Sequence, residues 1–85
     1  MLYYVYLIVA KKTKSFVSYV GYTNNLEKRL KDHNNSKGAK FTRGKIWTLA
    51  YKKSYRSKSI AMKEEYKLKK NLKLRASIKQ NFLHK

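Results

Sequence analysis

Aromatic and β-branched side chains fill the first ten residues of the chain. Leu2–Ala10 carries an apolar run over residues 5–10 with Tyr6 inside it, and Phe16–Tyr22 has the same character. Such runs are typical of strands. The polar segment Lys11–Ser15 between them predicts a turn. We therefore expect an antiparallel hairpin at the N-terminus.

Helical spacing follows the hairpin. Apolar and basic positions recur at intervals of three and four, which places them on one helix face: Leu26, Arg29, Leu30 and His33. A small polar residue, Thr23 or Asn24, is predicted to cap this helix. The polar residues of 34–38 are predicted to end it.

The second half of the chain predicts a strand and two helices. After a basic, glycine-containing loop over 36–45, Ile46–Lys52 indicates a third strand, with Trp47 in the core. Ser57 or Ser59 is predicted to cap a second helix that runs to about Lys70. Leu72–Leu83 predicts a short terminal helix that repeats apolar residues at Leu74, Ile78 and Phe82. The order ββαβαα predicts an α+β fold, in which helices flank a small, mainly antiparallel three-stranded sheet. No linker composition divides the chain, so we expect 1–85 to form a single domain.

The net charge of the chain predicts a polyanionic partner. The chain has 22 Lys and Arg against four acidic residues, a net charge of +18, most of it after residue 36. A field of this size opposes compaction unless a polyanion screens it, and nucleic acid is the commonest such partner. A lysine-biased proteome, a ribosomal partner and a membrane surface are the alternatives. Because the longest apolar run is about a third of a membrane span, we expect a soluble cytoplasmic protein and no membrane partner.

Few residues are available for catalysis. The absence of cysteine excludes disulfides, thiolate zinc sites and cysteine nucleophiles. Nucleic-acid cleavage by a divalent cation needs carboxylates, and the chain has only Glu27, Asp32, Glu64 and Glu65. No pairing pattern links them, which argues against a two-metal nuclease. A Mg²⁺ site with a single protein carboxylate is the remaining option, since Mg²⁺ keeps several waters.

Two strand motifs resemble a known family. Val5-Tyr6 and Tyr19-Val20-Gly21 are similar to the paired signature of the GIY-YIG nuclease superfamily, and Arg29 follows where that family has its helix arginine. His33 comes one helical turn later. Tyrosine is also an ordinary strand residue, so these positions taken alone leave a structural role open.

The second half of the chain extends the resemblance to residues 2–80. Residues 37–44 resemble the basic loop of the short single-domain bacterial branch, the YhbQ-like proteins, and 59–70 resemble its acidic helix. Tyr4 stands where the signature has its first glycine, and an aromatic there suits this branch. The resemblance implies a GIY-YIG fold and hydrolysis of DNA phosphodiesters, with single-stranded or structured DNA as substrate.

Five residues would carry the implied chemistry. Tyr6 would act as a phenolate-like general base toward water, and Tyr19 would position the water or the phosphate. Arg29 would bind the non-bridging oxygens and stabilise the transition state. His33 would assist the base or donate to phosphate. Glu65 would ligate Mg²⁺ or Mn²⁺, with Glu64 as the alternative if the helix register is one residue out.

Other residues would contact nucleic acid. The candidates are Gly21, Lys40, Phe41, Thr42, Arg43, Lys69 and Lys70. A side chain at Gly21 would block the approach of phosphate, and the cations and Thr42 would bind the backbone unless the loop is merely solvated. Phe41 would either stack on a base or anchor the core. A catalytically weak nucleic-acid-binding module is the alternative function, and a ribosome-associated basic protein is a third.

Overall fold

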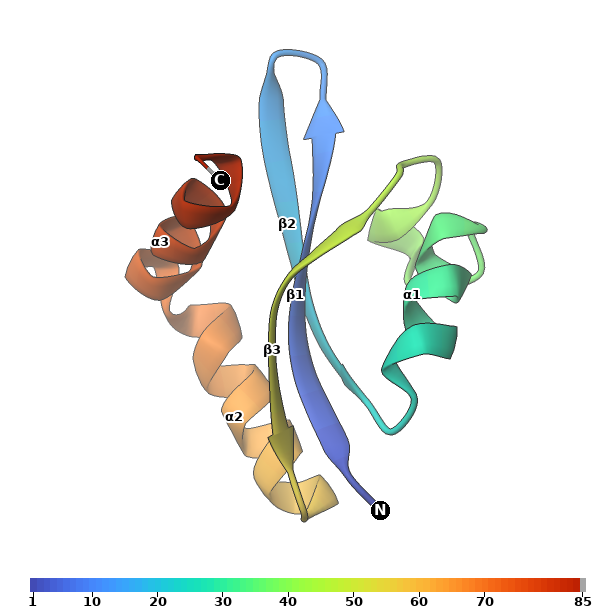
Figure 1. Cartoon of the computed structure of the whole chain (residues 1–85), viewed down its shortest axis with the longest axis vertical. Coiled ribbons are helices and arrows are strands. Elements are labelled where there is room, and N and C mark those ends of the chain that lie inside the picture. The colour runs from blue at the N-terminus through green and yellow to red at the C-terminus, as the bar shows by residue number, and fades with distance from the viewer. Residues whose placement is uncertain (85) are drawn as a thin grey trace.

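The computed structural model describes residues 1–84. The strands β1 (Tyr3–Lys12), β2 (Ser15–Thr23) and β3 (Thr48–Tyr55) form an antiparallel sheet in the order β2-β1-β3. The helices are α1 (Leu26–Asn34), α2 (Lys58–Lys70) and α3 (Leu72–Leu83), and a 3₁₀ turn, η1 (Lys40–Thr42), lies between α1 and β3. The order ββαβαα and the antiparallel sheet confirm the α+β prediction (Figure 1).

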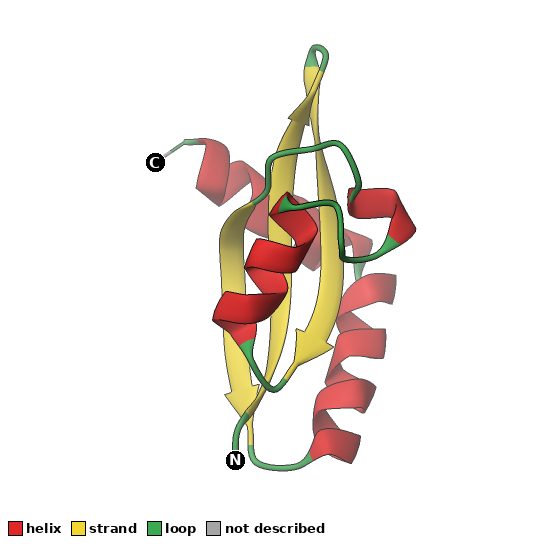
Figure 2. Cartoon of the chain, turned by 90° about the vertical axis from the view of Figure 1, so that its right-hand side faces the viewer, coloured by secondary structure: helices red, strands yellow, loops and turns green. Residues whose placement is uncertain are grey.

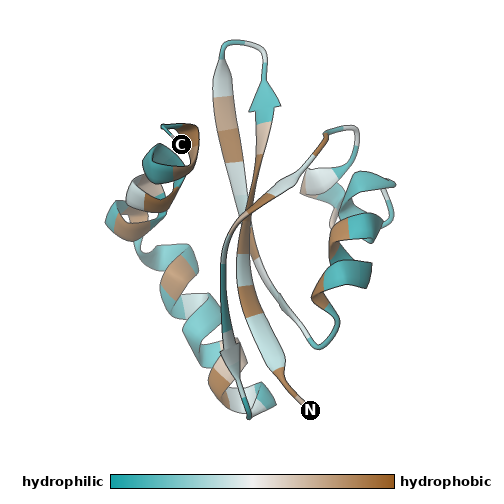
Figure 3. Ribbon diagram, in the orientation of Figure 1, coloured by the Kyte–Doolittle hydropathy of each residue, from teal (hydrophilic) through white to brown (hydrophobic). Residues whose placement is uncertain are grey.

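The central strand β1 is buried on both faces. The apolar run from Val5 to Ala10 is at most 3% exposed at every position. α1 covers one face of the sheet, while α2 and α3 cover the other (Figure 2). The hydrophobic residues of β1 accordingly lie in the middle of the molecule (Figure 3). Burial on both faces explains why this segment is continuously apolar rather than alternating.

Alternation along β1 divides its side chains between two cores. Val5, Leu7 and Val9 pack toward α2 with Ala61 and Leu68. Tyr6, Ile8 and Ala10 pack on the other face with Trp47, joined by Leu26 and Leu30 of α1. Successive strand residues point to opposite faces, so Tyr6 is placed on the α1 face by its position alone.

Several predicted boundaries are wrong. The turn predicted over Lys11–Ser15 is shorter, because Lys11 pairs with Phe16 and Lys12 pairs with Ser15. The N-cap of α1 is Asn25, whose side chain accepts from Lys28 N, because Thr23 is still paired with Tyr4 in the sheet. β3 begins at Thr48 instead of residue 46, because the backbone of Trp47 hydrogen-bonds to the Asn34 side chain instead of β1. It also runs on to Tyr55, which pairs with Tyr3.

The other helices begin close to their predicted positions. Ser57 caps α2 through Ile60 N, as expected, and Asn71 caps α3 through Leu74 N. Ile78 and Phe82 of α3 pack against the sheet, while Leu74 remains partly exposed. Within residues 1–84, none of the helices combines the length and apolarity needed to cross a membrane.

Candidate active site

The Tyr6 side chain is enclosed between β1 and α1. It is 1% exposed, and its hydroxyl lies 2.8 Å from His33 Nε2. Its cross-strand partner is Gly21. A Cβ atom at that position would overlap the phenol oxygen of Tyr6. Gly21 therefore makes room for the Tyr6 phenol, whereas the sequence prediction placed it beside a phosphate.

His33 is fully buried, which excludes the surface position that a helix histidine ordinarily takes. Its Nε2 atom meets the Tyr6 hydroxyl, and its Nδ1 atom lies 2.9 Å from Thr42 Oγ1. The pKa of His33 is lowered by burial and by the nearby Arg29 charge, against a weaker opposing effect of Asp32. His33 is consequently neutral at pH 7 and has one nitrogen free to accept a proton.

Arg29 lies one helical turn before His33 and beside the Tyr6 hydroxyl. Burial raises the pKa of Tyr6, and the Arg29 guanidinium opposes that rise. The same interaction raises the pKa of Arg29. This guanidinium thus stabilises a negative charge on the Tyr6 oxygen, the form that a general base requires.

Arg29 also faces an open cleft. This cleft of about 440 Å³ is lined by Tyr3, Tyr22, Thr23, Asn24, Arg29 and Lys58. It therefore combines a cation from α1 with a cation from the first residue of α2. Paired cations of this kind suit a phosphate. Sequence reasoning missed Lys58, since nothing in its local sequence distinguishes it from the other lysines.

Tyr19 and Tyr6 lie on the same face of the sheet. The edge of the Tyr19 ring meets the His33 ring at a centroid distance of 5.3 Å. Tyr19 also stacks against Phe41, with 6.2 Å between centroids and 21° between ring planes. Phe41 is half-exposed, with Lys45 Nζ 5.1 Å from its centroid. Phe41 thus extends the aromatic cluster from the core to the surface. One part of it packs on Tyr19, as expected of a core anchor, and the exposed part leaves stacking on a base open.

The two glutamates of α2 face different tyrosines. Burial is the main cause of the raised pKa of both Tyr6 and Tyr55; the charge of Glu65 adds a small contribution at Tyr6, and that of Glu64 adds one at Tyr55. The Glu65 side chain is 18% exposed and lies 3.6 Å from Lys69 Nζ. Glu64 pairs with Lys67 and lines a separate hollow beside β3. Of the two carboxylates, Glu65 is the one within electrostatic range of Tyr6.

The predicted nucleic-acid contacts divide into exposed and buried residues. Lys40 and Arg43 are exposed on the loop, and Lys69 and Lys70 are exposed at the end of α2. Thr42 is fully buried, and its hydroxyl bonds to His33 and to the Ala39 carbonyl. The prediction that Thr42 contacts the nucleic-acid backbone is therefore not supported by its position, because its polar atoms already have internal partners.

Two further residues hold this arrangement and were not singled out from the sequence. A Cβ atom on Gly38 would overlap His33 Nδ1, so the loop can pass close to the ring only with glycine there. Asn34 hydrogen-bonds to both backbone groups of Trp47 and ties α1 to the start of β3. No local signal identifies either residue, since both contacts depend on the path of the loop.

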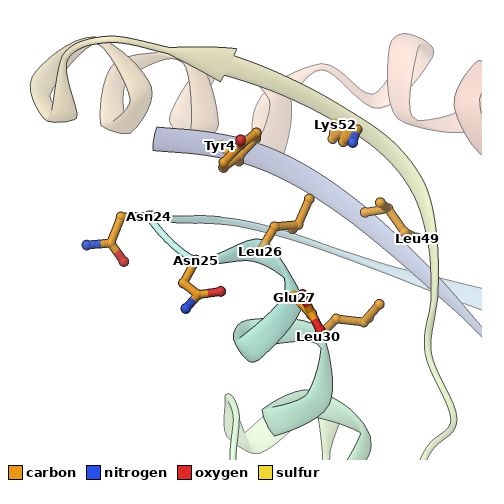
Figure 4. A pocket seen from close by; sticks show the side chains of 8 residues that line it. All are labelled: Tyr4, Asn24, Asn25, Leu26, Glu27, Leu30, Leu49 and Lys52. Atoms are coloured by element: carbon orange, nitrogen blue, oxygen red, sulfur yellow. The ribbon is translucent and has the colours of Figure 1, made fainter. Parts of the chain in front are cut away.

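A second hollow, of about 450 Å³, opens on the α1 face (Figure 4). Leu26 and Leu30 of α1 approach it from one side, and Tyr4, Leu49 and Lys52 approach it from the strands. It contains none of the predicted catalytic residues. The catalytic candidates gather instead around the Tyr6 hydroxyl.

Comparison with known proteins identifies the domain. Residues 2–79 match the GIY-YIG catalytic domain. The chain belongs to the GIY-YIG family. It is 46% identical over 68 residues to a UPF0213 protein of Oceanobacillus iheyensis, covering 79% of this chain and 76% of that protein. It is 47% identical over 68 residues to a UPF0213 protein of Clostridium perfringens, covering 79% and 70% respectively.

A solved structure is also similar. The solution NMR structure of a UPF0213 protein from Bacillus halodurans is 38% identical, covers 81% of this chain and 71% of that one, and has a TM-score of 0.45. The match of residues 2–79 to the family confirms, at the level of the family, the resemblance predicted from the strand motifs. A GIY-YIG catalytic domain indicates nuclease-type activity on nucleic acid.

A GIY-YIG domain implies a divalent metal. The side chains near Tyr6 suit a metal ion that takes few of its ligands from the protein. Within residues 1–84, no group of three or more His, Cys, Asp or Glu side chains is arranged to hold a metal. Glu65 supplies a single carboxylate in electrostatic range of Tyr6, held only by a long contact to Lys69. Mg²⁺ is satisfied by one carboxylate together with waters and phosphate oxygens.

The Gly21–Tyr6 contact can be tested through stability. We expect Gly21→Ala to lower the free energy of unfolding by about 1–3 kcal/mol, because the phenol must leave its rotamer or its hydrogen bond to His33. Urea denaturation of the single variants and of the double variant with Tyr6→Leu measures the effect. The loss caused by Gly21→Ala should shrink in the Tyr6→Leu background, since the phenol oxygen and the ring carbon that would overlap the added Cβ are then both absent. An equal loss in both backgrounds would contradict this contact as the cause.

Proposed function

We propose that this protein is a metal-dependent endonuclease that hydrolyses DNA phosphodiester bonds, with residues 1–85 acting as one nuclease domain. The observation that carries the proposal is the buried hydrogen bond between the Tyr6 hydroxyl and His33 Nε2, with the Arg29 guanidinium beside it. In this arrangement the Tyr6 phenol is the general base toward water. The neutral His33 imidazole accepts the proton of the phenol, and the Arg29 guanidinium stabilises the phenolate. The family match supports the same reaction class.

Proton transfer begins inside the protein in this mechanism. The Tyr6 O–H bond breaks, and its proton moves to the lone pair of His33 Nε2. The resulting phenolate is stabilised by Arg29 and takes a proton from water, whose oxygen attacks phosphorus as the bond from phosphorus to the leaving oxygen breaks. The leaving oxygen takes a proton from solvent and His33 gives up the one it received, so both residues return to their starting states. Tyr6 is only 1% exposed, whereas Arg29 beside it lines an open cleft, so in this mechanism the attacking water would come from the Arg29 side.

The cleft beside Arg29 would receive the scissile phosphate. Arg29 and Lys58 line it from two helices, so their charges converge on one phosphate group. The Arg29 fork binds two non-bridging oxygens and stabilises the charge that grows in the transition state. Tyr19, which packs against the His33 ring, would position the water or the phosphate.

Glu65 would hold Mg²⁺ or Mn²⁺. When bound, such an ion stabilises the leaving oxygen of the phosphodiester. Glu65 carries the negative charge needed to retain a cation on a protein of net charge +18. Its small contribution to the raised pKa of Tyr6, which is due mainly to burial, supports a metal site within electrostatic range of the proposed general base.

The exposed cations and Phe41 would bind the DNA strand next to the cleft. Lys40 and Arg43 flank Phe41 on the loop, and Phe41 stacks against Tyr19. A half-exposed ring on a loop that carries several cations, with Lys45 Nζ over the ring, is suited to an unpaired base and its neighbouring phosphates. Single-stranded or structured DNA is therefore the preferred substrate in this proposal.

Binding should depend steeply on salt. Each phosphate neutralised by Lys or Arg contributes about 0.7 to the log–log slope on single strands and about 0.9 on duplex. With 22 cations on 85 residues, we expect a slope of magnitude about three or more, from several such contacts. Fluorescence anisotropy of a labelled oligonucleotide over a series of salt concentrations measures it. A slope near zero would contradict nucleic acid as the partner.

A cleavage panel tests the function directly. Single strands, duplexes, flaps, branched junctions and RNA are incubated with the protein in Mg²⁺, in Mn²⁺ and in EDTA. We expect cleavage of DNA with the metal only, strongest on unpaired or branched DNA, and its loss in Tyr6→Phe. Binding without cleavage of any substrate would instead support the nucleic-acid-binding module.

A further inference from the structure

The hydroxyl of Thr42 fixes the position of one proton in the site. A threonine hydroxyl has a single hydrogen to donate. Thr42 Oγ1 lies 2.7 Å from the Ala39 carbonyl oxygen, which can only accept, and 2.9 Å from His33 Nδ1. If the hydrogen pointed to Nδ1, two oxygen lone pairs would face each other at 2.7 Å. Thr42 therefore donates to Ala39 and accepts a hydrogen from Nδ1.

The hydrogen on Nδ1 also determines the state of Nε2, the other nitrogen of the His33 ring. A neutral imidazole with hydrogen on Nδ1 carries its lone pair on Nε2. Nε2 lies 2.8 Å from the Tyr6 hydroxyl, so Tyr6 donates to it. One continuous chain of donors then runs from Tyr6 through His33 and Thr42 to the Ala39 carbonyl.

Thr42 is held in place by its surroundings. It is fully buried, and its carbonyl accepts from Trp47 Nε1 at 2.8 Å. Its backbone N–H bonds to the same Ala39 carbonyl that receives the hydroxyl proton. Gly38 closes against the Nδ1 side of the His33 ring. The loop therefore has a second purpose besides carrying basic residues, because it presents a hydroxyl to a buried imidazole.

We propose that Thr42 is a positioning residue of the active site, which holds His33 in the Nδ1–H form so that Nε2 is free to take the proton of Tyr6. The catalytic part of this inference rests on the proposed nuclease function, whereas the tautomer does not. When Nε2 accepts the proton, Nδ1 keeps its hydrogen and Thr42 still accepts it. The network thus serves both protonation states of His33 without rearrangement.

The test compares three variants of the full chain. Thr42→Val keeps the shape but removes the acceptor, Thr42→Ser keeps the hydroxyl, and Thr48→Val is a matched control at an exposed position of β3. Long-range ¹⁵N–¹H spectra of the imidazoles show which ring nitrogen carries the hydrogen. His84, the second of two histidines and an exposed one, serves as an internal reference.

We expect the parent and Thr42→Ser to show hydrogen on Nδ1 of His33, and Thr42→Val to lose that preference. DNA cleavage by Thr42→Val should fall by about tenfold to a hundredfold, as is typical when the partner orienting a site histidine is removed. DNA affinity should stay unchanged in every variant, and Thr42→Ser should recover most of the rate. The imidazole spectra of Thr42→Val also report whether that variant is folded.

Three outcomes would overturn the inference. The first is an unchanged tautomer in Thr42→Val. The second is an equal loss of rate in Thr42→Ser and Thr42→Val, and the third is a fall in DNA affinity that matches the fall in rate. If the tautomer responds as expected but the parent protein cleaves no DNA, the nuclease function fails while the assignment of the His33 proton stands.

Discussion

Glu65→Gln should abolish metal-dependent DNA cleavage while leaving the fold and the DNA affinity nearly intact. The substitution removes the carboxylate that we propose as the metal ligand, and with it the charge that would retain a cation against a net +18. Glutamine keeps the volume and has nearly the same helix propensity, so helix α2 should persist. The 3.6 Å ion pair with Lys69 is lost, but such pairs contribute less than about 1 kcal/mol near the surface.

Glu64→Gln is the matched control. It changes the same residue type one position away, on a side chain that faces Tyr55 and pairs with Lys67. Initial cleavage rates are measured across a Mg²⁺ titration, and binding is measured by anisotropy in EDTA. If Glu64→Gln is inactive and Glu65→Gln is active, the metal ligand was assigned one residue out. Parental rates in both variants would contradict a metal site with one protein carboxylate.

Arg29→Ala should lower the cleavage rate by about a hundredfold or more while weakening DNA binding only slightly. One guanidinium is a small part of a binding surface with 22 cations. It lies beside the Tyr6 hydroxyl, however, and in the proposed mechanism it would stabilise the charge that develops in the transition state. Single-turnover cleavage at saturating protein separates the chemical step from binding.

Arg43→Ala serves as the comparison for Arg29. It removes the same group from the exposed loop, so its effect should appear in affinity and in the salt dependence rather than in the single-turnover rate. Arg29→Lys adds a second comparison, because lysine keeps the charge but loses the planar fork. Equal losses of binding and rate in Arg29→Ala would place Arg29 in the general basic surface instead of the catalytic centre.

Local sequence signals determined the order of the elements. The apolar run of β1 and the helical spacing of Leu26 and His33 each depend on a few neighbouring residues, and the structure confirms both elements. The helical repeat also put Arg29 one turn from His33, and this repeat is the same in any fold. The shared face of Tyr6 and Tyr19, in contrast, depends on the register between β1 and β2, which only the structure supplied.

Contacts between distant segments were decided by the tertiary structure. The local sequence of Thr42 predicts an exposed loop residue. In the structure it is buried, because the loop folds back onto α1 and brings the Thr42 hydroxyl to His33. β3 begins later than predicted for a similar reason. The Asn34 side chain hydrogen-bonds to the backbone N–H and carbonyl of Trp47, which are therefore not paired with β1. A hydroxyl or amide can bond locally or across the fold, and its local sequence is the same in either case.

The sequence by itself therefore determined which residue types lie on which strand and helix, and the chemistry that they allow. Only the tertiary structure decided that Gly21 accommodates the Tyr6 phenol, that Gly38 closes against His33, and that Glu65 rather than Glu64 is within electrostatic range of Tyr6. The physical reason is that periodicity fixes the direction of a side chain relative to its own element. Its neighbours are fixed by how separate elements pack, and that depends on the whole chain.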